Sequence, residues 1–185
     1  MQTILSSDNG NTFIGKLNDN FAECGSAFDG KKYCALGDSI TWGYIPRNAP
    51  GYEGQLDSYA KLTAERLGMT FENYGIVGST IAYHASRDPM SVRYANMPND
   101  ADIITVMGGT NDVRNGITLG TFSDRTNTTF YGALHVLLQG LYTKYIGGVT
   151  PTTGKTKKII VCTPIKLLDA TSSSLPNTIE NNANV

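Results

Sequence analysis

The sequence predicts one α/β domain in which a parallel β-sheet is covered by helices on both faces. Two observations support this fold class. Short apolar runs typical of buried strands alternate with segments whose apolar residues recur at helical spacing. Polar, glycine-rich clusters follow the first three apolar runs, and such clusters meet where parallel strands end. A chain of 185 residues is long enough for one domain with a sizeable core.

Residues 1–30 are predicted to form an arm outside the main domain, which comprises residues 31–185. The arm is polar and rich in asparagine, and Phe13, Leu17 and Phe21 recur at helical spacing. Its sequence weakly resembles the openings of some phage tail proteins, which would place the domain on a virion. An ordinary N-terminal extension with one amphipathic helix is the simpler interpretation.

Four segments are predicted as strands and two as helices. The strand over residues 101–109 is apolar apart from Asp102 and Thr105, as expected of a strand buried on both faces. The other predicted strands are residues 31–36, 70–75 and 158–164. A helix over residues 58–67 has Ala60, Ala64 and Leu67 on one face, and a longer helix spans about residues 124–145. Residues 170–185 show no periodicity and are predicted as loop.

Composition argues against several classes of function. The net charge is −1 and no Lys/Arg run exceeds two residues, so we expect neither a nucleic-acid nor an anionic membrane partner. The sequence shows no signal peptide and no apolar run of membrane-spanning length, and it leaves the localisation open between the cytoplasm and a virion. Cys24, Cys34 and Cys162 lack metal-ligand spacing and are expected to be reduced, with the last two as core residues.

The polar clusters after the strands contain the groups that acyl transfer requires. This chemistry needs a nucleophile and hydrogen-bond donors aimed at the developing oxyanion. Ser39 follows the first strand and supplies a hydroxyl and a backbone N–H. Gly78, after the second strand, supplies another N–H, and the amide of Asn111, after the third strand, supplies a third donor.

Three motifs resemble those of the SGNH (GDSL-type) hydrolase family. They are "GDSITWG", "NYGIVGST" and "GGTND", in this order, within a match that runs over about residues 31–164. The resemblance implies a flavodoxin-like three-layer fold and an esterase, lipase or acetylhydrolase activity without metal or cofactor. It implies that Ser39 is the nucleophile and that Gly78 and Asn111 are oxyanion donors. Small acyl esters such as acetylated sugars are the expected substrates, contacted by Asp38, Thr110 and His84.

The sequence departs from this family at the catalytic base. The family's Asp-x-x-His block, which follows a fifth strand, has no counterpart here. His84 and His135 both come too early. His135 is expected to be a packed helix residue. His84 is expected to be a surface loop residue, with a place at the cleft rim as the alternative. The sheet is predicted to lack its last strand and helix, leaving the strand at residues 158–164 as an open edge or paired with a partner.

Three explanations for the missing block remain open. The chain could be the N-terminal fragment of a longer hydrolase. It could be a complete protein that has lost catalysis and keeps a binding cleft. Alternatively, a second chain, such as another copy in a homo-oligomer, could supply the missing strand and histidine.

Overall fold

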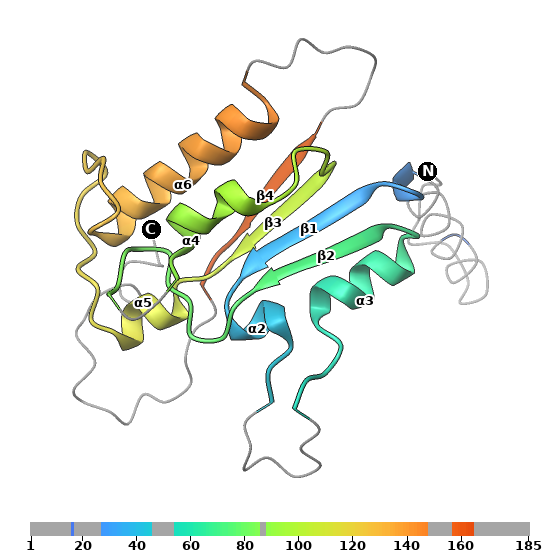
Figure 1. Ribbon diagram of the computed structural model, residues 1–185, viewed down its shortest axis with the longest axis horizontal. Helices are drawn as coiled ribbons and strands as arrows, with labels where there is room; N and C mark the ends of the chain where they lie inside the picture. Colours follow the sequence, from blue (N-terminus) through green and yellow to red (C-terminus); the bar gives the residue numbers. More distant parts are fainter. Residues whose placement is uncertain (1–15, 17–26, 46–53, 86–87, 148–156, 165–185) are drawn as a thin grey trace, which may run out of the picture.

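Four parallel strands form the sheet of the computed structural model, which describes residues 16, 27–45, 54–85, 88–147 and 157–164 (Figure 1). In chain order the elements are β1 (Lys32–Gly37), α2 (Ser39–Trp42), α3 (Tyr59–Arg66), β2 (Thr70–Gly75), α4 (Met90–Arg93), the 3-10 helix η1 (Tyr94–Asn96), β3 (Ile103–Met107), α5 (Thr110–Arg114), α6 (Phe130–Tyr145) and β4 (Lys158–Cys162). The predicted arm with Phe13, Leu17 and Phe21 and the predicted loop at residues 170–185 lie outside the described residues.

The strand order in the sheet is β2-β1-β3-β4, and every neighbouring pair is parallel. Gly37 at the end of β1 is in register with Gly75 of β2 and Met107 of β3. The carboxyl ends of these three strands are therefore level. The predicted parallel sheet is confirmed, and the loops that leave these strands begin at one edge.

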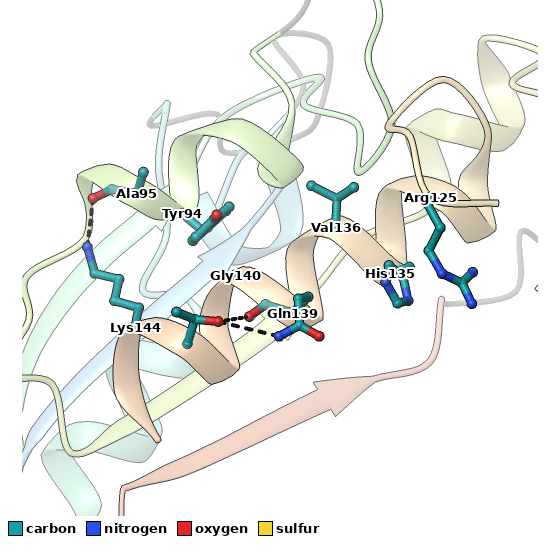
Figure 2. A pocket seen from close by; sticks show the side chains of 9 residues that line it. Tyr94, Ala95, Arg125, His135, Val136, Gln139, Gly140 and Lys144 are labelled. Carbon is teal, nitrogen blue, oxygen red and sulfur yellow. Dashed lines mark hydrogen bonds between the residues drawn. The ribbon is translucent and has the colours of Figure 1, made fainter. Parts of the chain in front are cut away.

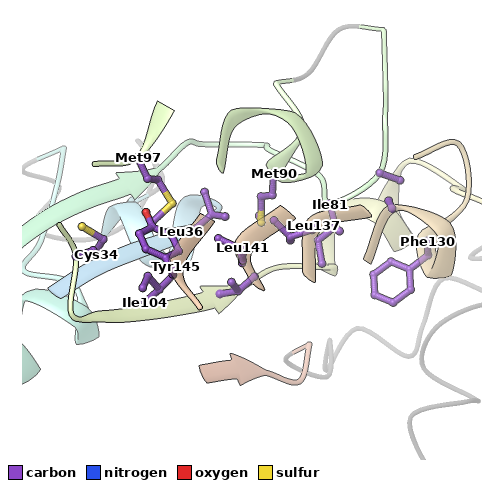
Figure 3. Close-up of a cluster of buried hydrophobic side chains, with 14 of the residues drawn as sticks. Cys34, Leu36, Ile81, Met90, Met97, Ile104, Phe130, Leu137, Leu141 and Tyr145 are labelled. Atoms are coloured by element: carbon purple, nitrogen blue, oxygen red, sulfur yellow. The ribbon is translucent and has the colours of Figure 1, made fainter. Parts of the chain in front are cut away.

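Helices cover both faces of the sheet, as predicted for a three-layer domain (Figure 1). On one face, Leu137, Leu141 and Tyr145 of α6 pack in the larger hydrophobic core with buried residues of β1 and β3 (Figure 3). On the other face, Ala60 and Ala64 of α3 pack in a smaller core with alternate residues of the same two strands. Because successive strand residues point to opposite faces, β1 and β3 contribute to both cores.

The long helix is shorter than predicted, because α6 begins at Phe130 and not near residue 124. Thr129 caps it, accepting a hydrogen bond from the Gly132 backbone N–H at 3.2 Å. The Thr129 hydroxyl donates to the Asp124 carboxylate at 2.6 Å, and that carboxylate also accepts from Thr121 N–H at 3.2 Å. Short Thr and Asp side chains thus hold the preceding segment in turns that compete with the helical hydrogen bonds.

Strand β4 lies at the edge of the described sheet, as expected, and pairs only with β3. Its Ile160 and Val161 are 48% and 45% exposed. Cys34 of β1 is fully buried and Cys162 of β4 is partly buried, both as free thiols. Among the described helices, none combines the length and the apolar character needed to cross a membrane.

Candidate active site

The loop after β1 places Ser39 at the first position of α2. Asp38 caps this helix, because its carboxylate accepts a hydrogen bond from Ile40 N–H at 2.9 Å. Gly37 must lack a side chain here, since a Cβ would lie 1.9 Å from the Thr41 hydroxyl oxygen. The Gly-Asp-Ser sequence therefore forms a tight exit from the strand that fixes the direction of Ser39.

The loop after β2 presents Gly78 in a turn that requires glycine. Ser79 N–H donates to Ile76 C=O at 3.0 Å, which closes a four-residue turn with Val77 and Gly78 in its centre. Gly78 has φ +77°, as the third residue of a type II turn has, and side-chain-bearing residues rarely adopt this conformation.

The loop after β3 leads into α5, which carries Asn111. The Asn111 side chain is 9% exposed, and its Nδ2 donates to Ser79 C=O at 2.9 Å. An amide nitrogen has two hydrogens, so this bond orients the side chain and leaves the second N–H for another acceptor.

Ser39, Gly78 and Asn111 lie on one pocket of about 520 Å³ at the carboxyl end of the sheet. The described residues that line it are Ser39, Tyr44, Val77, Gly78, Asn111, Arg114 and Asn115. The convergence expected from the three motifs is therefore present in the fold.

The residues predicted to contact substrate are not among those that line this pocket. Asp38 is 1% exposed and its carboxylate is occupied in capping α2, so the structure gives it a positioning role and corrects the prediction. Burial raises the pKa of the Asp38 carboxyl, and the charges of Arg93 and Arg114 partly oppose this shift. Thr110 and His84 are partly buried outside the lining, so their contacts with substrate remain predictions.

Arg93, which the sequence analysis did not single out, joins the strand ends to the loop that carries Gly78. Its guanidinium is buried and donates to Tyr74 C=O of β2 and Gly37 C=O of β1. It also donates to the Ser79 hydroxyl, from Nη2 at 3.1 Å, and to Asp88 C=O, from Nε at 3.2 Å. Burial lowers the pKa of Arg93 to about 10, so it remains charged at neutral pH. One planar cation thus fixes three segments beside the pocket.

Asp112 holds the far side of the same loop. Its carboxylate is fully buried and accepts from Ile81 N–H and Ala82 N–H, each at 2.9 Å. Burial raises the pKa of Asp112 to about 6, although the two N–H donors favour its charged form. Asn111 and Asp112 are adjacent in α5, so this short helix bonds to the Gly78 loop at Ser79 and again at Ile81 and Ala82.

The residues that line or support the pocket without having been predicted differ in how visible they are in the sequence. Arg114 and Asn115 follow Asn111 by three and four positions, which places them on the same helix face. That spacing carries information only within a helix, and no helix was predicted directly after "GGTND", where the structure has α5. Arg93 lies between apolar residues in "MSVRYANM", and nothing in its local sequence indicates which backbone carbonyls it reaches.

Neither histidine among the described residues lines the pocket that contains Ser39. His135 is partly buried in a separate cavity of about 530 Å³ between α6 and η1, with Arg125 close by (Figure 2). Lys144 bridges the other end of that cavity by donating to Ala95 C=O at 2.6 Å. His135, predicted as a packed helix residue, is partly buried and lines this groove. In the described part of the chain, no three His, Cys, Asp or Glu side chains are grouped to hold a metal ion.

Comparison with known proteins places this geometry in a family. The model of the GDSL-like lipase/acylhydrolase family matches residues 35–182. The chain belongs to this family. The match begins within β1 and includes all three motifs that line the pocket. A search of curated proteins found no match to the sequence.

Solved structures similar to this GDSL-like chain support the fold. A protein from Lactobacillus plantarum is 38% identical, with a TM-score of 0.54 over 72% of this chain and 57% of its own. The aryl esterase of M. smegmatis is 21% identical, with a TM-score of 0.56 over 75% of this chain and 66% of its own. An acetylxylan esterase from Geobacillus stearothermophilus is 20% identical, with a TM-score of 0.52 over 85% and 70%. The chain thus spans less than two thirds of the Lactobacillus protein.

Proposed function

We propose that this protein hydrolyses small acyl esters through an acyl-Ser39 intermediate. The observation that supports the proposal is the convergence of Ser39, Gly78 and Asn111, from three separate strand ends, on one pocket. Membership of the GDSL-like family supports the same class of reaction.

In the proposed reaction, the Ser39 hydroxyl oxygen attacks the carbonyl carbon of the ester while a base takes its proton. The carbonyl oxygen becomes an oxyanion, which the N–H groups of Ser39 and Gly78 and the free N–H of Asn111 stabilise. The bond to the alcohol oxygen then breaks, and the departing alcohol takes the proton. Water attacks the acyl-Ser39 ester in the same way, releasing the carboxylic acid and restoring the hydroxyl.

The dimensions of the pocket support a small substrate. A volume of about 520 Å³ is within the usual range for small-molecule sites. Tyr44 and Val77, both 43% exposed, add apolar surface beside the polar donors. An acetyl ester of a sugar, with an apolar ring face and a compact acyl group, suits this combination.

The base in the proposed mechanism comes from outside the residues that line the described pocket. None of those residues is a histidine or a carboxylate. The family resemblance implies that an Asp-x-x-His segment supplies it. The same observation favours a second candidate function, an ester-binding or glycan-binding domain that lacks catalysis.

Hydrolysis of 4-nitrophenyl acetate tests the proposal. We expect the 185-residue chain to be slow, because a serine without its base keeps only the roughly 10³–10⁴-fold acceleration over water that oxyanion donors and binding provide. A longer chain with an Asp-x-x-His segment should turn over at ordinary enzyme rates, and Ser39→Ala should abolish that activity.

The control is Ser123→Ala, at an exposed serine outside the pocket, which should leave the rate unchanged. Hydrolysis that survives Ser39→Ala would refute the acyl-serine proposal. Full activity of the mass-verified 185-residue chain would instead refute the argument about the base. His84→Ala and His135→Ala would then identify an unexpected base.

A further inference from the structure

The pocket that contains Ser39 has one charged side chain among its described lining residues, and that side chain is cationic. Arg114 is the last residue of α5 and lines the pocket together with Asn111 and Asn115. Positions three and four residues apart share one face of a helix. The guanidinium is therefore presented from the same helix face as the proposed oxyanion donor.

Within the described part of the chain, Arg114 differs from Arg93 in having no hydrogen-bond or ion-pair partner. Arg93 is buried and donates to four protein groups, whereas Arg114 is exposed and makes no hydrogen bond or ion pair with the residues that the structure describes. Its neighbour Asn115 is already engaged, because its Nδ2 donates to Asn111 C=O at 2.6 Å. The five N–H donors of Arg114 are thus available to a ligand.

The charges around Arg114 do not neutralise the mouth of the pocket. The carboxyl group that interacts with its charge is Asp38, which is 1% exposed, caps α2 and also interacts with the charge of Arg93. The other lining residues are neutral polar or apolar side chains. A negatively charged group entering from solvent therefore meets one accessible cation and no accessible carboxylate in this lining.

We propose that Arg114 binds a carboxylate carried by the substrate, so that the preferred esters are anionic close to the bond that is cleaved. The inference rests on the proposed function, because it places the scissile carbonyl at Ser39 in the same pocket. The planar guanidinium matches a carboxylate with two parallel hydrogen bonds. The carboxylate belongs either to the acyl group or to the alcohol, and both sources present the same chemistry to Arg114.

Two matched pairs of esters distinguish these sources. In the first pair, 4-nitrophenyl monoadipate and 4-nitrophenyl hexanoate differ by a carboxylate on an acyl chain of the same length. In the second pair, 4-acetoxybenzoate and 4-acetoxybenzamide differ by a carboxylate on the alcohol portion. Binding of each ester to the ¹⁵N-labelled Ser39→Ala chain is measured by NMR titration, so that the comparison does not depend on turnover.

The expected result is that the anionic member of at least one pair binds about two- to fivefold more tightly, as one exposed charged contact provides. Arg114→Gln should remove this preference and Arg114→Glu should reverse it, and 0.5 M salt should weaken it. Arg66→Gln, at an exposed arginine of α3 outside the pocket, is the matched control and should leave the preference intact.

Equal binding within both pairs, absence of binding, or a preference that survives Arg114→Gln would overturn the inference. Failure of the proposed function gives a different result. It would appear as a lack of Ser39-dependent hydrolysis of all four esters by the longer chain, while the binding comparison on the Ser39→Ala chain still stands.

Discussion

Replacing Arg93 by methionine tests whether one buried cation holds the pocket loops together. Methionine keeps most of the apolar volume of the arginine stem and removes the guanidinium. Two strand-end carbonyls, Gly37 C=O and Tyr74 C=O, then lose a charged donor. Ser79 and Asp88 lose less, because the Ser79 hydroxyl still donates to Asp88 C=O at 2.6 Å.

The size of the loss follows from these contacts. A buried acceptor that loses its donor costs about 1–3 kcal/mol. Gly37 C=O keeps a second donor, Ile76 N–H at 3.1 Å, so its cost lies at the lower end of that range. The variant no longer buries a charge, and this gain offsets part of the summed cost of the lost hydrogen bonds. We expect Arg93→Met to lower the free energy of unfolding by about 2–4 kcal/mol, which corresponds to about 5–15 °C in melting temperature for a chain of this size.

Urea and thermal unfolding followed by circular dichroism measure this loss. Arg66→Met is the control, because Arg66 is exposed on α3, and surface substitutions usually change stability by less than about 0.5 kcal/mol. Arg93→Lys keeps the charge, but one ammonium cannot reproduce a planar fork, so it should recover less than half of the loss. A loss of less than about 1 kcal/mol in the free energy of unfolding of Arg93→Met would show that the Arg93 guanidinium does not hold the strand ends and the Gly78 loop together.

Two further predictions concern α5. Asn111→Ala removes one oxyanion donor and should lower kcat of the active longer chain about 10²–10³-fold while KM changes little; an unchanged kcat would exclude the proposed role. Burial raises the pKa of Asp112 from an ordinary 3.8 to about 6, so the carboxyl holds its proton more tightly in the folded chain than in the unfolded chain. Its contribution to stability is therefore fully present below pH 4 and is lost as the pH rises through 6, by on the order of 3 kcal/mol. Urea unfolding between pH 4 and pH 7.5 should show this fall in the wild type and not in Asp112→Asn. If the free energies of unfolding of the two proteins change with pH in parallel, the fall does not come from Asp112.

Much of the fold could be predicted because it depends on local patterns. A mostly apolar run such as residues 101–109 is stable as a strand when both faces are covered, which implies a sheet between helices. The sheet observed here, with α3 on one face and α6 on the other, follows from this requirement. The start of α6 was missed because side-chain hydrogen bonds around Asp124 and Thr129 outweigh the helical periodicity.

By itself, the sequence determined that three polar motifs follow three strands, and this order was enough to predict that Ser39, Gly78 and Asn111 would meet. Parallel strands end at a common edge, so the prediction needed no knowledge of side-chain contacts. Only the tertiary structure decided what supports these residues and what else lines their pocket. Arg93 reaches carbonyls up to 56 positions away in the chain, and Asp38 turned from a predicted substrate contact into a buried cap. Such roles depend on distances between segments far apart in sequence, and those distances exist only after the helices have packed on the sheet.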